Sequence, residues 1–259
     1  MKFLKYCAIA SLLISPLSYA ETNVTLTYED VDSYPWNMKD GSGVDLILLK
    51  MVDDALPDVS FTYTQAPWKR CLNNIETGKT EGCFTASYKE KRLKHGFYPG
   101  THAGNPVDEN LKLHSSSYSL YVLKGSGISV DGKLSISGLK GKVAAPSGYS
   151  IGGDLEKAGY KVDAKASKSV NNFEKLLAGR VGAVSALTLN GNNILAKQSK
   201  YADKIDVIET PLVNKPYYLM LSKQFIAKDK ATAEMIWNKI AEVRESQAFK
   251  DSAGAFLAK

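Results

Sequence analysis

Two series of alternating strand-like and helix-like segments constrain the fold of this chain most. The first series predicts strands at 24–28, 59–64 and 81–86, with helices at 44–56 and 67–76. The second predicts strands at 142–145, 160–164, 181–185 and 205–208, with helices at 151–158, 170–178 and 188–199. Such alternation favours a mainly parallel sheet with helices on both faces. Because the pattern occurs twice, we expect an α/β protein of two lobes.

The segments outside these two series are interpreted as connectors and as a C-terminal part. Pro- and Gly-rich stretches at 96–113 and 211–216 are predicted to be connectors, and 125–132 is predicted to be a loop. Further strands are expected at 117–123 and 217–222. An amphipathic helix at 231–244 and a last helical turn or two at 249–257 complete the prediction.

The first 20 residues are typical of a secretory signal. Lys2 and Lys5 precede a mostly apolar run at 7–17, and Ser18-Tyr19-Ala20 is a small-x-small cleavage site. The apolar run is too short to span a bilayer stably. Cleavage would remove two lysines and no acids, so the formal charge of +6 becomes 6 − 2 = +4. The lysines are scattered, and we expect no nucleic-acid partner.

The mature chain would keep two cysteines, Cys71 and Cys83. In an oxidising compartment an even pair on adjacent packed elements predicts a disulfide, and the alternative is two buried thiols. The histidines have no metal-ligand spacing, so we predict no metal and no other cofactor; they are His95, His102 and His114.

The stretch 66–92 holds the sharpest candidate site. Its helix is followed by a short strand, and ligands of α/β proteins bind at the carboxyl ends of strands. Polar side chains stand at or just after that end and would line a site with one fixed positive charge; they are Thr85, Ser87, Tyr88 and Arg92.

Small polar residues after this strand, followed by Lys91-Arg92, resemble the family 3 periplasmic solute-binding proteins of amino-acid ABC transporters. The lead-in Ala-Pro-Trp-Lys-Arg at 66–70 resembles a branch that stands without its own permease. The resemblance implies a periplasmic protein of two lobes joined by two crossovers. Lobe 1 would be 21–113 and 214–259, and lobe 2 would be 114–213. It also implies that Arg92 clamps a ligand carboxylate.

The segment Gly148-Tyr149-Ser150-Ile151-Gly152 has two functional interpretations. It matches Gly-x-Ser-x-Gly, but a hydrolase of that type needs a histidine after the serine, and all three histidines precede it. Alternatively, the free N–H groups of a helix start favour an anion. The resemblance implies that Gly148, Tyr149 and Ser150 hold the carboxylate opposite Arg92. An ordinary capped helix start is the remaining alternative.

Further candidates are weaker. Aromatic residues at strand–helix junctions could wall a ligand, as such residues often do in clefts; they are Tyr34, Trp36, Trp68 and Tyr88. Arg70 faces either the cleft or solvent. In the family, a carboxylate that pairs with the ligand ammonium follows the strand ending at 184–187. The matching residue here is Leu187 by count, or Ser185 if the register differs, and neither is an acid. The absence of an acid there disfavours an ordinary α-amino acid, unless Glu29, Asp30 or Asp32 substitutes.

These observations predict a protein, expected to be a monomer, that closes around a small anionic solute. It would pass the solute to a membrane permease or to a sensor such as a kinase, cyclase or chemoreceptor. The main alternative is an enzyme on the same scaffold, like the dehydratases and lytic transglycosylases among the relatives, which needs a positioned acid. A buried acid with a raised pKa facing Arg92 would favour that alternative. A structural or adhesion protein would have no closable cleft.

Overall fold

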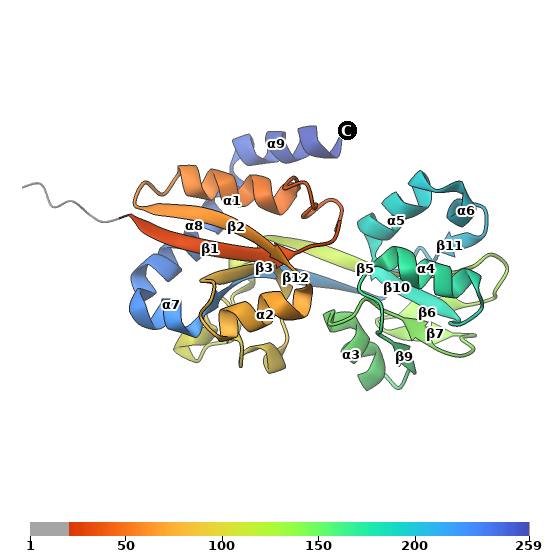
Figure 1. The fold of residues 1–259 in the computed structure, drawn as a ribbon. Coiled ribbons are helices and arrows are strands. Elements are labelled where there is room, and N and C mark those ends of the chain that lie inside the picture. Colours follow the sequence, from red (N-terminus) through yellow and green to blue (C-terminus); the bar gives the residue numbers. More distant parts are fainter. Residues whose placement is uncertain (1–20, 259) are drawn as a thin grey trace, which may run out of the picture.

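The computed structural model describes residues 21–258, so the predicted signal lies outside the described residues. Figure 1 shows two α/β lobes, joined by two long strands that run from one lobe into the other. None of the helices within 21–258 has both the length and the apolar character required to span a bilayer. The predicted fold class is confirmed.

The first lobe is built on three parallel strands. They are β1 (Thr22–Glu29), β2 (Val59–Ala66) and β3 (Gly82–Ser87), with β1 between the other two. The connecting helices are α1 (Val44–Asp54) and α2 (Trp68–Glu76). The C-terminal helices α7 (Lys223–Lys228), α8 (Lys230–Glu245) and α9 (Gln247–Leu257) return to this lobe, where α8 and α9 pack on α1 (Figure 1).

The alternation of side chains explains how this sheet is covered on both faces. In β1, Leu26 packs into the cluster of α1 and α8, whereas the neighbouring Thr27 contacts Cys71 of α2. Leu221 belongs to the same cluster as Leu26, and Met220 packs on the α2 side. Successive residues of a strand point to opposite faces, so each strand contributes to two cores.

The second lobe holds the other end of the same ten-stranded sheet, which continues through β12 (Val213–Ser222) and β5 (His114–Leu123). Its strands are β8 (Val143–Ala144), β9 (Val162–Asp163), β10 (Ala183–Leu187) and β11 (Ile205–Val207). Its helices are α3 (Ser150–Lys157), α4 (Ser169–Leu177), α5 (Thr188–Lys197) and α6 (Ser199–Ala202). The loop predicted at 125–132 instead begins a hairpin of β6 (Ser129–Gly132) and β7 (Ser135–Ser137).

The two lobes share β5 and β12. The first half of β12 pairs antiparallel with β5, and its second half pairs with β3 of the first lobe and with the short strand β4 (Gly96–Phe97). The connector predicted at 211–216 is therefore wrong from Val213 onward. Pro216 lies opposite Ser115 in this ribbon, although proline removes one ladder donor. The predicted lobe boundaries fall where these two strands begin.

The predicted disulfide is absent, and both cysteines are free, buried thiols. The Cys71 thiol donates a hydrogen bond to the carbonyl of Ala66 (3.1 Å) and accepts one from Thr27 (3.6 Å). Burial raises the pKa of Cys71 to about 12 and that of Cys83 well above its usual range. The pair therefore serves packing between α2 and the sheet, which is the alternative that the sequence left open.

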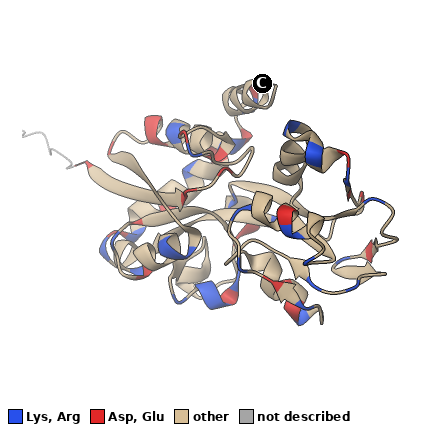
Figure 2. Cartoon of the chain, turned by 45° about the vertical axis from the view of Figure 1, so that its right-hand side comes forward, with Lys and Arg blue, Asp and Glu red and all other residues tan. Residues whose placement is uncertain are grey.

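Charged residues are spread over both lobes. In the view of Figure 2, Lys and Arg are interspersed with Asp and Glu along the chain.

Candidate ligand-binding site

The carboxyl ends of strands from both lobes meet at one cavity between the lobes. β1 ends at Glu29, β3 at Ser87 and β10 at Leu187, and all three residues line it. The cavity and the space by which it opens to solvent together measure about 370 Å³. Its other walls are Ser33, Asn37, Trp68, Phe84, Thr85, Arg92, Tyr118, Tyr149, Ser150 and Tyr217.

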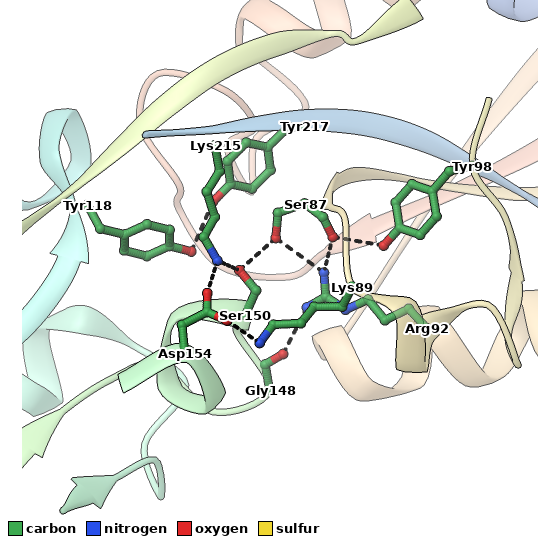
Figure 3. A network of polar contacts seen from close by, with 10 residues as sticks. All are labelled: Ser87, Lys89, Arg92, Tyr98, Tyr118, Gly148, Ser150, Asp154, Lys215 and Tyr217. Atoms are coloured by element: carbon green, nitrogen blue, oxygen red, sulfur yellow. Dashed lines mark hydrogen bonds and ion pairs between the residues drawn. The ribbon is translucent and has the colours of Figure 1, made fainter. Parts of the chain in front are cut away.

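Arg92 lies at the centre of this arrangement. A 3-10 turn at Glu90–Arg92 follows β3 and turns the side chain inward, leaving it 4% exposed. Its guanidinium donates to the carbonyl oxygens of Ser87 (2.7 Å) and Gly148 (3.0 Å) (Figure 3). It also lies 5.1 Å from the centre of the Trp68 ring. Arg92 therefore touches both lobes across the cleft.

The second-lobe loop reaches Arg92 through its backbone. Gly148 has a φ of +80°, a conformation that favours glycine, and an added Cβ would lie 3.1 Å from Trp68. The prediction assigned the amide groups of this loop to the ligand. In the structure the Gly148 carbonyl also takes part, because it accepts from Arg92.

Hydroxyl groups continue the contact between the lobes. The Ser87 hydroxyl donates to Ser150 Oγ (2.8 Å), which also accepts from Lys215 Nζ (2.8 Å). No side chain caps the start of α3, so the first N–H groups of this helix have no side-chain partner. The cap predicted as the ordinary alternative is not formed.

Lys215 lies beside Ser150, a contact that was not predicted. Burial lowers the pKa of Lys215, and the hydrogen bond to Asp154 opposes that change. Lys215 donates to both Asp154 and Ser150, so it is not positioned here to accept the proton of Ser150. The described histidines contact Glu76, Glu234 and Asp45 instead of this serine.

Asp154 joins the lobes by charge. This residue of α3 accepts from Lys89, which follows β3 (2.5 Å), and from Lys215 of β12 (Figure 3). Burial alone would raise the pKa of Asp154, but the bonds to the two lysines outweigh it and the pKa is lowered. The ionised aspartate therefore ties the second lobe to two cations outside it.

Glu29 is the one carboxylate among the residues that line the cavity. Its side chain is 6% exposed, and it accepts a hydrogen bond from the Tyr149 hydroxyl (2.5 Å). Burial raises the pKa of Glu29 to about 7, although Tyr149 and the charge of Arg92 act in the opposite direction. The second-lobe position predicted to lack an acid, Leu187, also lines the cavity.

A buried network supports the first-lobe wall. Thr85 lies in the left-handed region with a φ of 59°, and its hydroxyl donates to Asp45 (2.7 Å). Asp45 also pairs with His114 Nδ1 (2.7 Å), and Trp36 stacks on His114 with ring centroids 3.5 Å apart. The strained conformation of Thr85 is thus held by a carboxylate that is 1% exposed.

The structure brings most of the predicted residues together and leaves four apart. Six predicted residues line the cavity: Trp68, Thr85, Ser87, Arg92, Tyr149 and Ser150. Gly148 lies next to the cavity, because its carbonyl accepts a hydrogen bond from Arg92. Tyr34 stacks on Phe256, Trp36 covers His114, Arg70 is exposed on α2, and Tyr88 packs edge-on against Tyr98. Those four are not among the residues lining this cavity.

Several wall residues were missed by the sequence. Phe84, Tyr118 and Tyr217 lie within strands, where aromatic residues are usually read as core. The hydroxyls of Tyr118 and Tyr217 are 2.9 Å apart, at the ribbon shared by the lobes. The only available signal was the position of these tyrosines next to a predicted connector.

No family model and no curated protein matches the sequence. Solved structures match it over most of its length. The GluR0 ligand-binding core from Nostoc punctiforme in complex with L-glutamate shares 13% identity over 91% of this chain and 100% of its own, with a TM-score of 0.69. A histidine kinase sensor domain with similarity to periplasmic binding proteins shares 13% identity over 92% and 97%, with a TM-score of 0.71.

A third matching structure is of a binding protein that is the precursor of an enzyme. An ancestral amino-acid-binding protein, a precursor of cyclohexadienyl dehydratase, shares 14% identity over 90% of this chain and 94% of its own, with a TM-score of 0.65. This chain has the periplasmic binding protein fold. The cavity described above lies between the two lobes of this fold, where strand ends from both sides meet.

Proposed function

We propose that this protein is an exported, standalone solute-binding protein of the family 3 type. It captures a small carboxylate-bearing solute between its lobes and presents it to a membrane transporter or sensor. The observation that carries the proposal is the buried Arg92 guanidinium, which faces a cavity lined by both lobes.

The chemistry of Arg92 supports a carboxylate as the bound group. Its guanidinium now donates to two neutral carbonyls, and a carboxylate is a stronger acceptor that can bond in a bidentate manner. Ser150 and the N–H groups at the start of α3 would add donors from the other lobe. Contacts from both lobes give the ligand a higher affinity for the closed form, which is what closure requires.

The remaining walls limit the kind of solute. Aromatic rings line the cavity and would cover an apolar part of the solute. Glu29 would receive a donor group, either an ammonium or a neutral N–H or O–H. An amino acid or a related acid, bound with its carboxylate at Arg92 and its donor group at Glu29, would give both side chains a partner.

A thermal-shift screen of the mature protein with amino acids, organic acids and short peptides tests the proposal. A true ligand at 100 times its Kd stabilises the protein by about 2.7 kcal/mol. We expect Arg92→Ala to abolish the shift and Arg70→Ala, an exposed arginine outside the cavity, to retain it. Circular dichroism checks that both variants fold. Full affinity in Arg92→Ala would contradict the proposal.

Glu29 supports a second candidate, an enzyme that uses this residue as a general acid. A buried carboxyl with a pKa of about 7 in the same cavity as Arg92 has the properties required of such a group. The similarity to a dehydratase precursor points in the same direction. Incubating each hit of the screen with the protein and following it by NMR separates the two candidates. Turnover that Glu29→Gln abolishes while binding persists would favour the enzyme, and an unchanged solute favours the binding protein.

A further inference from the structure

The indole N–H of Trp68 has no hydrogen-bond partner within residues 21–258. Its Nε1 is shielded from solvent as well, and the whole residue is only 6% exposed. Trp68 lines the cavity between the lobes, and Glu29 in the same wall accepts from Tyr149 instead. A buried donor normally has an acceptor, because an unpaired one loses its bonds to water without replacement. An acceptor for this N–H is therefore expected from a molecule held in the cavity.

The N–H edge of the Trp68 ring lies where the two lobes meet. Trp68 is the first residue of α2 in the first lobe. A Cβ added at Gly148 of the second lobe would lie 3.1 Å from Cδ1 of the Trp68 ring, and Cδ1 is bonded to Nε1. Separation of the lobes would therefore open this edge to water, and closure removes that water. The indole N–H thus needs a new acceptor in the closed form.

The charge of Arg92 determines which kind of acceptor is favoured. The guanidinium carbon lies 5.1 Å from the centre of the Trp68 ring. An oxygen that accepts from Trp68 Nε1 therefore lies close to a positive charge, and charged acceptors form stronger hydrogen bonds than neutral ones. A carboxylate has two oxygens with about four lone-pair sites, so it can accept from a guanidinium and from an indole at once. A carboxamide offers one oxygen and no charge.

We propose that the Trp68 indole N–H and the Arg92 guanidinium share the two oxygens of one carboxylate of the solute. The proposal rests on the proposed function, because it assigns a further donor to the same carboxylate. Trp68 is then a specificity-determining residue that favours a free carboxylate over the corresponding amide. It also couples binding to closure, since a bound carboxylate gives the N–H a partner that the empty closed form does not provide.

The test is an NMR titration of the ¹⁵N-labelled mature protein with acetate, and with acetamide as the neutral probe of the same shape. The chain has three tryptophans, and Trp68→Phe assigns the indole signal of Trp68. We expect acetate to shift this indole proton downfield in a saturable manner, and acetamide to bind at least tenfold more weakly. The Trp237 indole is the internal control. It already donates to the Leu219 carbonyl (2.9 Å), so its signal should not move.

Two variants separate the indole N–H from other effects of substitution. Trp68→Phe keeps an aromatic ring without the N–H, and it should weaken acetate binding at least fivefold when binding is followed at the backbone amide of Ser150. Tyr63→Phe is the matched control in the first lobe. It removes a buried hydroxyl that has no partner in the described part of the chain and that does not line the cavity. Its affinity for acetate should change less than twofold.

An indole signal that does not move or does not saturate, equal binding of acetamide, or an equal loss in Tyr63→Phe would overturn the proposal. A shift of the Trp68 indole that persists in Arg92→Ala would also overturn it, because the two residues would then not share one carboxylate. Solute binding that depends on Arg92 but not on Trp68 refutes the role of the indole and leaves the proposed function standing. Acetate binding that uses both residues, with no hit in the solute screen, does the reverse.

Discussion

The two walls of the cleft differ in how they present polar groups. The first-lobe wall carries charged side chains, Arg92 and Glu29, and rests on the buried carboxylate of Asp45. The second-lobe wall offers a glycine carbonyl, the start of α3 and the Ser150 hydroxyl, with Leu187 where the resemblance places a carboxylate. The charged side chains of the cavity are therefore concentrated in one lobe, and the other supplies neutral donors and acceptors.

This difference suggests an order of events. A solute can form its charged contacts with the first lobe alone, and the neutral contacts of the second lobe are added on closure. Asp154 then links α3 to Lys89 and Lys215 outside the cavity. Binding and closure would thus depend on different residues, which variants can separate.

The largest expected effect comes from the support of the charged wall. Asp45→Ala would leave the Thr85 hydroxyl and His114 without their common partner inside the core. We expect a loss of about 3 kcal/mol in the free energy of unfolding, measured by urea denaturation. Asp54→Ala, at the exposed end of the same helix, should cost less than about 0.5 kcal/mol. Equal losses would mean that Asp45 does not support this wall.

The next effect concerns Glu29 and pH. A carboxyl whose pKa rises from 4.5 to about 7 on folding stabilises the protein fully below pH 4.5. That contribution is lost as the pH rises through 7, which amounts to roughly 3 kcal/mol at about 1.36 kcal/mol per pH unit. Glu29→Gln should remove this pH dependence from urea denaturation measured between pH 4.5 and 8. If the two proteins lose stability in parallel, the pKa of Glu29 is not raised.

A smaller effect is expected where the walls are tied together. Asp154→Asn removes the charge that Lys89 and Lys215 share, which should favour the open form. We expect solute affinity by calorimetry to fall roughly tenfold, about 1.4 kcal/mol. The matched control is Asp163→Asn, because Asp163 is comparably buried but pairs with Lys175 inside the second lobe. Its affinity should stay within twofold of that of the unmodified protein, and a comparable loss would refute the closing role of Asp154.

The smallest effect is expected at the rim. Tyr88 was predicted to touch the ligand, yet it is 37% exposed and packs edge-on against Tyr98. Tyr88→Ala should therefore leave the Kd of the solute within twofold. A loss of affinity greater than fivefold would show that the wall extends further than the cavity described here.

Periodicity predicted most of the fold because buried strands and amphipathic helices leave regular patterns. It missed α7, whose six residues are too few for a clear period; its start is marked only by Ser222, whose hydroxyl accepts from the N–H of Phe225. It also missed the strand character of 213–216, since Pro211 and Pro216 suggested a connector. Short or proline-containing elements depend on tertiary pairing that no local pattern reveals.

The site residues that could be predicted are those at or just after the ends of strands. Ser87 ends a strand, Arg92 lies in the turn that follows it, and Ser150 begins a helix; such positions meet at one edge of a sheet. Contacts between distant segments were not predictable. Lys215 and Asp154 are 61 residues apart, and nothing in either segment indicates the other. The disulfide predicted for Cys71 and Cys83 was wrong because neighbouring elements alone do not show whether two thiols face each other.

A crystal structure of the mature protein with the strongest hit of the solute screen tests the central claim most directly. The account predicts a carboxylate within hydrogen-bonding distance of the Arg92 guanidinium and of donors at Ser150 or the start of α3. A solute bound outside this cavity, or bound within it with no contact to Arg92, would contradict the account.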